Sequence, residues 1–149
     1  MSPVRSMRSN RLGRRNTSTA YEAETRGIVV RVNPYFLPDQ SDPTERHWVW
    51  AYAVEIENKS EDVVQLMSRR WVITDALGRV EEVEGDGVLG EQPTLKPGES
   101  FRYTSGCPLP TTSGVMEGQY RLVTGDGDNF EAAIPAFSLD LPDAPRIVN

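Results

Sequence analysis

The chain has 149 residues, of which 38% are hydrophobic, and a formal net charge of −6. A chain of this length buries one sizeable core, so we expect a single folded domain with tails. No apolar run approaches the roughly 18 residues of a membrane-spanning helix, and the N-terminus lacks the apolar centre of a secretory signal. We therefore expect a soluble, cytoplasmic protein without a membrane partner.

Residues 1–20 form a basic segment that contains no acidic residue, whereas residues 21–149 hold the other 11 basic residues and all 22 acidic ones. The basic residues of this segment are Arg5, Arg8, Arg11, Arg14 and Arg15. Ser, Asn, Thr and Gly separate them without an apolar period, so we expect a disordered tail. Such an arm could contact nucleic acid or the acidic body. A solvated extension, or an upstream start codon ahead of Met7, is the plainer interpretation.

The first half of residues 21–142 shows the period-two alternation of β-strands. Residues 28–32 alternate until Pro34, which cannot donate to a ladder. The clearest strand covers residues 48–56, because bulky side chains occupy every second position. Beyond a turn at residues 58–60, Leu66 and Trp71 have opposite parity. This change of phase predicts a β-bulge between Met67 and Arg70 that keeps both on the core face.

The second half continues with short strands separated by turn signals. A hairpin at residues 75–79 leads into an acidic, edge-like strand at residues 80–83. Alternation returns at residues 101–105, 120–122 and 130–134, and with the opposite parity after Pro135 at residues 137–141. Asp126, Gly127, Asp128 and Asn129 form a strong turn signal.

Seven to eight short strands and no convincing helix predict an all-β fold, an antiparallel two-sheet sandwich of the immunoglobulin or fibronectin type III kind. We place this domain at residues 21–142 and a C-terminal tail at residues 143–149. The large aromatic residues at strand parity are the predicted core. They are Trp48, Trp50, Trp71, Phe101, Tyr103 and Phe130.

Gly85, Gly87 and Gly90 match the pattern G-x-G-x-x-G of a pyrophosphate loop. Such a loop lets backbone N–H groups approach phosphate and is followed by a helix whose dipole favours the anion. Here Pro93 and Pro97 stand where the early turns of that helix would lie, and acidic residues surround the motif. We therefore interpret the glycines as suppliers of positive φ angles in a tight connection. A backbone nest that binds an anion without a helix is the alternative.

Neither a catalytic nor a metal site is indicated by the sequence. Cys107 is the only cysteine and His47 the only histidine, and they are distant in the chain, so a nucleophile and base pair is not expected. A lone cysteine excludes an internal disulfide, which fits a reducing compartment. The acidic turn at residues 126–129 begins like a calcium loop but lacks its later glycine and glutamate, so a hairpin tip is favoured. No cofactor is expected.

Several segments of the chain resemble the ApaG family. The main one runs from Gly85 to Leu109 and reads G-D-G-V-L-G-E-Q-P-T-L-K-P-G-E-S-F-R-Y-T-S-G-C-P-L. Shorter ones are E-I-E-N at residues 55–58, S-R-R-W-V-I-T-D-A at residues 68–76 and G-x-Y-R-L-V at residues 118–123. The resemblance covers residues 21–141. It implies a fibronectin type III-like sandwich, a phenotype of cobalt tolerance and magnesium efflux in bacteria, and a binding role.

We expect from these observations a non-enzymatic binding module that recognises a protein partner. In a sandwich, end loops and exposed sheet edges commonly meet ligands. The candidate surfaces are residues 85–97 and residues 107–118, and the candidate partner residues are Glu82, Glu84, Glu91 and Gln92. The alternative function is nucleotide or polyphosphate binding through Gly85, Gly87 and Gly90. A homodimer through an edge strand is a further possibility.

Overall fold

The computed structural model describes residues 21–142, so the tails expected at residues 1–20 and 143–149 lie outside the described residues. Within this range the chain forms nine strands and two 3-10 turns, and no helix is long and apolar enough to cross a membrane. The strands are β1 (Tyr21–Thr25), β2 (Ile28–Phe36), β3 (Trp48–Asn58), β4 (Val64–Asp75), β5 (Val80–Asp86), β6 (Thr94–Leu95), β7 (Ser100–Leu109), β8 (Gly114–Thr124) and β9 (Asn129–Leu139). The 3-10 turns are η3 (Pro38–Gln40) and η4 (Pro43–Glu45).

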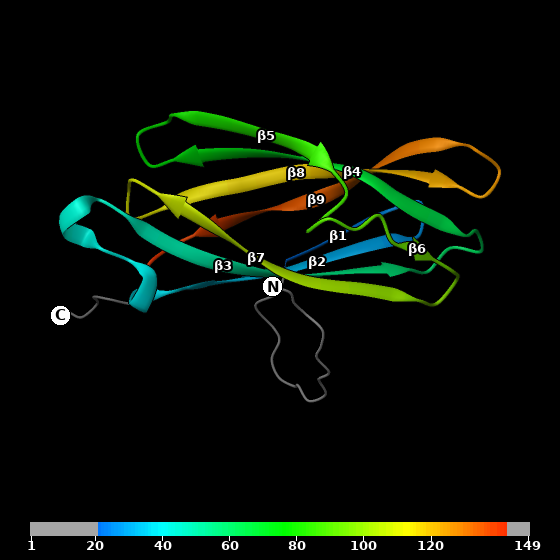
Figure 1. The fold of residues 1–149 in the computed structure, drawn as a ribbon, viewed down its shortest axis with the longest axis horizontal. Helices are drawn as coiled ribbons and strands as arrows, with labels where there is room; N and C mark the ends of the chain where they lie inside the picture. Colours follow the sequence, from blue (N-terminus) through cyan, green and yellow to red (C-terminus); the bar gives the residue numbers. More distant parts are fainter. Residues whose placement is uncertain (1–20, 143–149) are drawn as a thin grey trace.

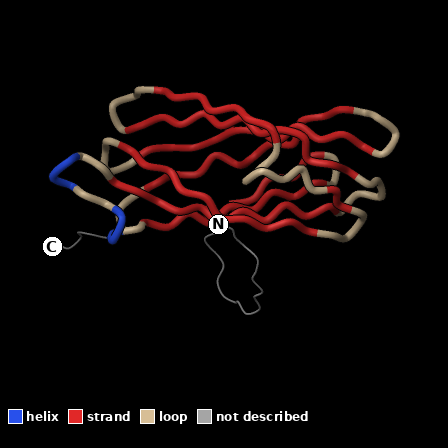
Figure 2. The backbone as a smooth tube through the Cα atoms, viewed as in Figure 1, coloured by secondary structure: helices blue, strands red, loops and turns tan. Residues whose placement is uncertain are grey.

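The strands form two antiparallel sheets that pack face to face, which confirms the predicted all-β sandwich (Figures 1 and 2). The first sheet has the order β1-β2-β3-β7. The second has the order β5-β4-β8-β9, with the short β6 also paired to β4. The connection from β5 through β6 to β7 carries the chain from the second sheet to the first.

One side of the sandwich is closed because β1 lies against β9. The Tyr21 and Phe137 rings are 6.0 Å apart between centroids. The hydroxyls of Tyr21 and Ser138 lie 3.1 Å apart, and the Ala133 N–H donates to Thr25 Oγ1 over 3.1 Å. The outer strands on the opposite side, β5 and β7, have no second neighbour in the sheet order of residues 21–142. The free edges therefore lie on this opposite side.

The aromatic residues predicted to form the core differ in how deeply they are buried. Trp50, Trp71 and Tyr103 are buried, whereas Trp48, Phe101 and Phe130 are partly buried and pack against the core from its margin. In the centre, the Trp71 ring meets the Tyr52 ring edge-on at 5.2 Å between centroids. Tilted and edge-on contacts of this kind are the preferred geometry of aromatic pairs.

Two β-bulges explain the changes of parity in the sequence. The pairing of β4 with β8 shifts between Leu66 and Ser68, which confirms the bulge predicted after Leu66. On β9 the pairing with β8 passes from Ile134 directly to Phe137, so Pro135 and the next residue face a single residue of β8. A bulge therefore accommodates Pro135, and the two strands expected around it are one continuous strand.

Candidate functional site

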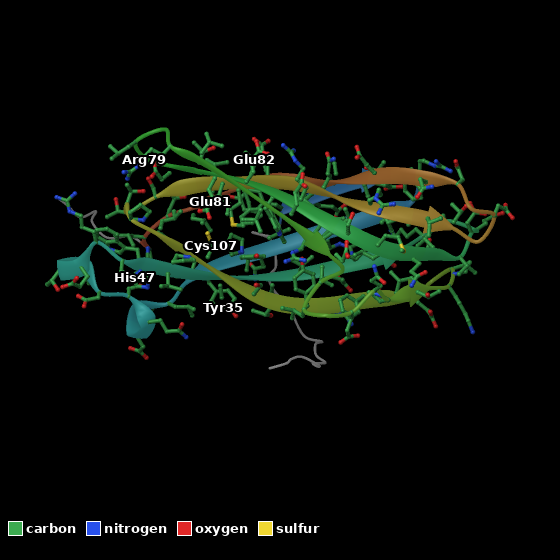
Figure 3. The ribbon with its side chains drawn as sticks, turned by 45° about the horizontal axis from the view of Figure 1, so that its top comes forward. Tyr35, His47, Arg79, Glu81, Glu82 and Cys107 are labelled. Atoms are coloured by element: carbon green, nitrogen blue, oxygen red, sulfur yellow. The ribbon has the colours of Figure 1, made fainter. Side chains whose placement is uncertain are left out.

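The predicted acidic strand is β5, an edge strand of the second sheet. It pairs with β4 from Val80 opposite Thr74 to Asp86 opposite Ser68. Its side chains are mostly exposed to solvent, and four of its seven residues are acidic. These are Glu81, Glu82, Glu84 and Asp86. Figure 3 shows Glu81 and Glu82 on this edge, beside the hairpin that carries Arg79.

Arg70 of β4 holds the two outward carboxylates of β5. Its Nη2 lies 2.7 Å from Glu82 Oε1, and its Nε lies 3.2 Å from Glu84 Oε2. All three side chains are exposed, so these ion pairs contribute little to stability. One arginine shared between two carboxylates leaves this edge with a negative charge.

A shallow groove of about 390 Å³ adjoins the end of β5 and crosses the strands of the second sheet. It is lined by charged and polar residues of both signs. These are Ser68, Arg69, Arg70, Glu84, Gly85, Asp86, Gln119, Arg121 and Glu131. The lining offers hydrogen-bonding groups to an extended partner and contains no apolar side chain.

The glycine motif forms the connection that leaves β5. Gly87 and Gly90 have φ angles of 62° and 82°, as expected for glycines in a tight connection, whereas Gly85 is an ordinary residue of β5 opposite Arg69. The Gly87 N–H donates to Met67 O over 2.8 Å. Val88 and Glu91 exchange two backbone hydrogen bonds of 2.9 Å. Three N–H groups of the loop are therefore engaged within the protein, and no α-helix follows it in the described residues.

Arg69 brings a positive charge to this loop from another strand. Its Nη1 donates to Gly87 O over 2.8 Å and to Asp86 O over 3.3 Å. A Cβ at Gly85 would lie 2.8 Å from the same nitrogen, so the missing side chain leaves room for the guanidinium. Sequence reasoning missed Arg69 because only the β4–β5 register places it opposite Gly85.

Of the two remaining candidate partner residues, Gln92 has a structural role. Its side-chain amide donates to Met67 O over 2.9 Å, and its backbone carbonyl accepts from the side-chain amide of Gln65 over 3.0 Å. These hydrogen bonds therefore hold the loop after β5 against β4. Glu91 is exposed, and only its backbone is engaged, with Val88.

The two candidate surfaces lie at opposite ends of β5. Residues 85–97 begin at its C-terminal end. The loop within residues 107–118 contacts the hairpin that precedes β5, where the Ala76 N–H donates to Thr111 Oγ1 over 3.1 Å. The two segments therefore do not form one patch, but β5 joins them into a continuous edge.

Three tyrosines lie near one another in the core. The hydroxyls of Tyr103 and Tyr120 are hydrogen-bonded to each other, and both residues are buried. Burial raises the pKa of Tyr103, Tyr120 and Tyr52 above that of a free phenol, and Arg69 opposes this in all three. Phenols of raised pKa stay protonated at neutral pH and are poor general bases. The cluster serves as a polar contact within the core.

Cys107 and His47 occupy different environments. Cys107 is buried on β7 opposite Trp50, and this burial raises the pKa of its thiol to about 11. His47 is exposed in the loop before β3, where its backbone exchanges hydrogen bonds with Asp42. Both are labelled in Figure 3. A thiol of raised pKa is a poor nucleophile, and no interaction among the described residues joins it to His47.

The acidic turn at residues 126–129 is a hairpin tip between β8 and β9. The Gly127 N–H donates to Thr124 O over 2.9 Å, and Gly127 has a φ of 89°. Asp128 forms an ion pair of 3.1 Å with Arg26. Residues 21–142 contain no group of three or more His, Cys, Asp or Glu side chains arranged to hold a metal ion.

Comparison with known proteins gives consistent matches over the described domain. The model of the ApaG domain family, DUF525, matches residues 38–124. The ApaG protein of Brucella anthropi is 59% identical over 129 residues, which are 87% of this chain and 99% of that protein. That of Caulobacter vibrioides is 57% identical over 136 residues, 91% of this chain and 97% of that protein. A crystal structure of a Bordetella pertussis protein described as ApaA superimposes with a TM-score of 0.77 at 49% identity, covering 78% of this chain and 95% of that one.

Proposed function

Since the chain belongs to the ApaG domain family, we propose that it is a non-enzymatic binding module that captures a protein partner along β5. One observation carries this proposal: β5 is a free sheet edge, and five of its seven residues are exposed. An edge strand offers a row of unpaired backbone groups to which an extended segment can add. The free edge of β7 is less suited to a partner, because its exposed side chains alternate with side chains that are partly or fully buried.

The charge of β5 defines the kind of partner. Four carboxylates lie within seven residues, and only Glu82 and Glu84 have an ion-pair partner, Arg70, in the described residues. Glu82, Glu84 and Asp86 share one face of β5, so an extended segment with Lys or Arg at alternate positions would meet these three carboxylates while its backbone pairs with the edge. The polar groove beside β5 would take its side chains. A link to cobalt tolerance and magnesium efflux would run through that partner. A lone cysteine, which cannot form an internal disulfide, supports action in the reducing cytoplasm.

Charge reversal on the outward face of β5 tests the proposal. We expect the variant Glu82→Lys/Glu84→Lys to lose the partner while keeping its fold, because exposed ion pairs contribute little to stability. The matched control is Glu61→Lys/Asp126→Lys, which changes the net charge equally at two exposed turns away from β5. Pull-downs with the three proteins as bait, quantified by mass spectrometry, identify a partner recovered by the native and control baits only.

The purified partner then permits a direct test of the surface. Amide chemical-shift changes on titration should cluster on β5 and on the loops at its two ends. Equal recovery of the partner by all three baits, or shifts confined to the first sheet, would refute binding along β5.

Binding of a nucleotide or polyphosphate at residues 85–90 is the second candidate, and Arg69 is the observation that favours it. Its guanidinium lies at the loop, and no carboxylate of the described residues forms an ion pair with it. Phosphate is a preferred ligand of arginine. This candidate predicts saturable shifts of Gly85, Gly87 and Gly90 with ATP or a dinucleoside tetraphosphate. The shifts should vanish in Arg69→Met and persist in Arg102→Met, which removes an arginine from the first sheet.

A further inference from the structure

Three exposed hydrophobic side chains lie together at the end of the second sheet where β5 begins. Leu77 is 70% exposed in the hairpin turn between β4 and β5 (Figure 1), Val80 is 59% exposed at the first position of β5, and Val115 of β8 is 42% exposed. Val80 pairs with Thr74, which in turn pairs with Val115, so these three residues form one row on the outward face of the sheet. We call Leu77, Val80 and Val115 the apolar patch. Exposed apolar side chains that cluster are typical of an interaction surface, whereas single ones are not.

The outward face of β5 changes from apolar to acidic along the strand. Val80, Glu82, Glu84 and Asp86 occupy alternate positions and therefore share this face. The apolar patch includes the first of them, and the three carboxylates follow toward the C-terminal end of the strand. This asymmetry gives β5 a direction that a partner can recognise.

The same residues turn their backbone groups to the free edge. Arg79 O and Gly87 N–H, just before and just after β5, both hydrogen-bond to the backbone of β4. Because backbone groups alternate between the two sides of a strand, Val80, Glu82 and Glu84 direct their N–H and C=O groups away from β4. An added strand that bonds to these groups places the side chains opposite them on the outward face.

The second sheet favours an antiparallel direction for the added segment. All strand pairs of this sheet in the described residues are antiparallel, and antiparallel ladders are the more stable per residue. A segment that runs antiparallel to β5 meets Asp86 first and Val80 last. Basic side chains opposite the carboxylates and an apolar side chain opposite Val80 would stabilise this pairing.

A second copy of the chain does not fit this edge. The outward face of β5 has three carboxylates and no basic residue. Two β5 strands paired along their edges would therefore bring carboxylates together, and like charges directly opposite each other are destabilising. The occupant is a different chain whose segment complements both the charge and the apolar patch.

We propose that the partner segment adds antiparallel to β5 and carries three basic residues at alternate positions, followed two positions later by a large apolar residue that covers the apolar patch. This inference rests on the proposed function of β5, to which it adds the direction of the segment and its anchor. The basic residues meet Asp86, Glu84 and Glu82 in that order. Charge brings the segment to the edge, and the apolar residue fixes its register.

Two fluorescein-labelled peptides of equal composition and with uncharged ends test this order. The forward peptide is Lys-Thr-Lys-Thr-Lys-Thr-Phe, and the reversed peptide has the same residues in the opposite order. Threonine fills the alternate positions because it is enriched in strands. In anisotropy titrations of the full-length protein at low ionic strength, we expect the forward peptide to bind about tenfold more tightly, because the reversed peptide loses a favourable pair at each end.

Substitutions in the protein separate the anchor from the charge. Val80→Ser should weaken binding of the forward peptide about fivefold and leave that of the reversed peptide nearly unchanged. The matched control is Val63→Ser, which replaces an exposed valine outside β5 and should alter neither affinity. Glu82→Lys/Glu84→Lys should abolish binding of both peptides.

A nitroxide label after the phenylalanine of the forward peptide reports the direction. It should broaden the amide signals of Leu77 and Val80 more than that of Asp86, and the opposite pattern would overturn the proposal. Equal affinity for the two peptides, lost in Glu82→Lys/Glu84→Lys, would overturn the direction and the anchor but retain the acidic edge of the proposed function. Binding that survives this charge reversal would overturn both. No binding of either peptide would overturn the inference, and the pull-downs would still decide the proposed function.

Discussion

A single methyl group at Gly87 should destabilise the protein far more than one at Gly90. Both glycines have positive φ angles, and an alanine in this conformation is strained by about 1–2 kcal/mol. They differ in their surroundings. A Cβ at Gly87 would lie 2.3 Å from the backbone oxygen of Glu91, whereas a Cβ at Gly90 would meet nothing within 4 Å.

The contact at Gly87 sets the size of the difference. A separation of 2.3 Å from a backbone atom cannot be relieved by a side-chain rotation, so the loop must open. Opening breaks the two hydrogen bonds between Val88 and Glu91, each with a net contribution of about 1 kcal/mol. We expect Gly87→Ala to lower the free energy of unfolding by about 3–4 kcal/mol and Gly90→Ala by about 1–2 kcal/mol.

Urea unfolding followed by tryptophan fluorescence measures this difference, because Trp50 and Trp71 are buried and report on the core. With a denaturant slope of about 2 kcal/mol per molar urea, the two midpoints should differ by about 1 M. Equal midpoints would refute the reasoning, because they would mean that the oxygen of Glu91 does not restrict Gly87. A loss of stability in Gly87→Ala identifies a glycine that the fold requires, whereas unchanged stability would leave only a role in the approach of a ligand.

Three further predictions concern buried or hydrogen-bonded groups. Tyr120→Phe leaves the Tyr103 hydroxyl without its partner and should lower the unfolding free energy by about 1–3 kcal/mol. In urea titrations, Tyr103→Phe/Tyr120→Phe should lose less unfolding free energy than the two single variants combined, and additive losses would contradict this. The thiol of Cys107, with its pKa raised to about 11, should react with Ellman's reagent at pH 7 only as the protein unfolds, and rapid reaction of the native protein would contradict its burial. Burial opposes the ionisation of Asp75, but hydrogen bonds from the backbone and side chain of Arg79 outweigh this effect and lower the pKa of Asp75 below 3.8. The ionised Asp75 therefore stabilises the folded protein above pH 3.8, and this stabilisation is lost as the pH falls through the native pKa. The stability gap between the native protein and Asp75→Asn, from urea midpoints between pH 7 and pH 2, should therefore shrink below pH 3.8, and a constant gap would contradict this sign.

The fold was predictable where side chains alternate strongly, and less so elsewhere. The bulky series from Trp48 to Ile56 corresponds to β3, and the change of parity after Leu66 indicated the observed bulge. The same reasoning divided β9 in two at Pro135, because a parity change alone does not distinguish a bulge from a break. β1 was not expected, since its five residues include one large apolar side chain, and β6 has only two residues.

The candidate site was predictable only in part, for a physical reason. The acidic edge of β5 and the turn role of Gly87 and Gly90 follow from local composition, and local composition is what a sequence shows directly. The position of Arg69 over Gly85, the hydrogen bond between Tyr103 and Tyr120, and the apolar patch beside β5 depend on which strands pair and in which register. Those pairings join residues far apart in the chain, and no local pattern encodes them.

The closure of the sandwich by β1 and β9 has a consequence for how the domain can be combined with others. Tyr21 and Pro142, the two ends of the described chain, line one groove of about 370 Å³ beside β2, and β9 is separated from β5 by two intervening strands. A second domain fused at either end would be tethered on the closed side, where it leaves the acidic edge accessible. The domain can therefore be appended to larger proteins, before or after another domain, without burying β5.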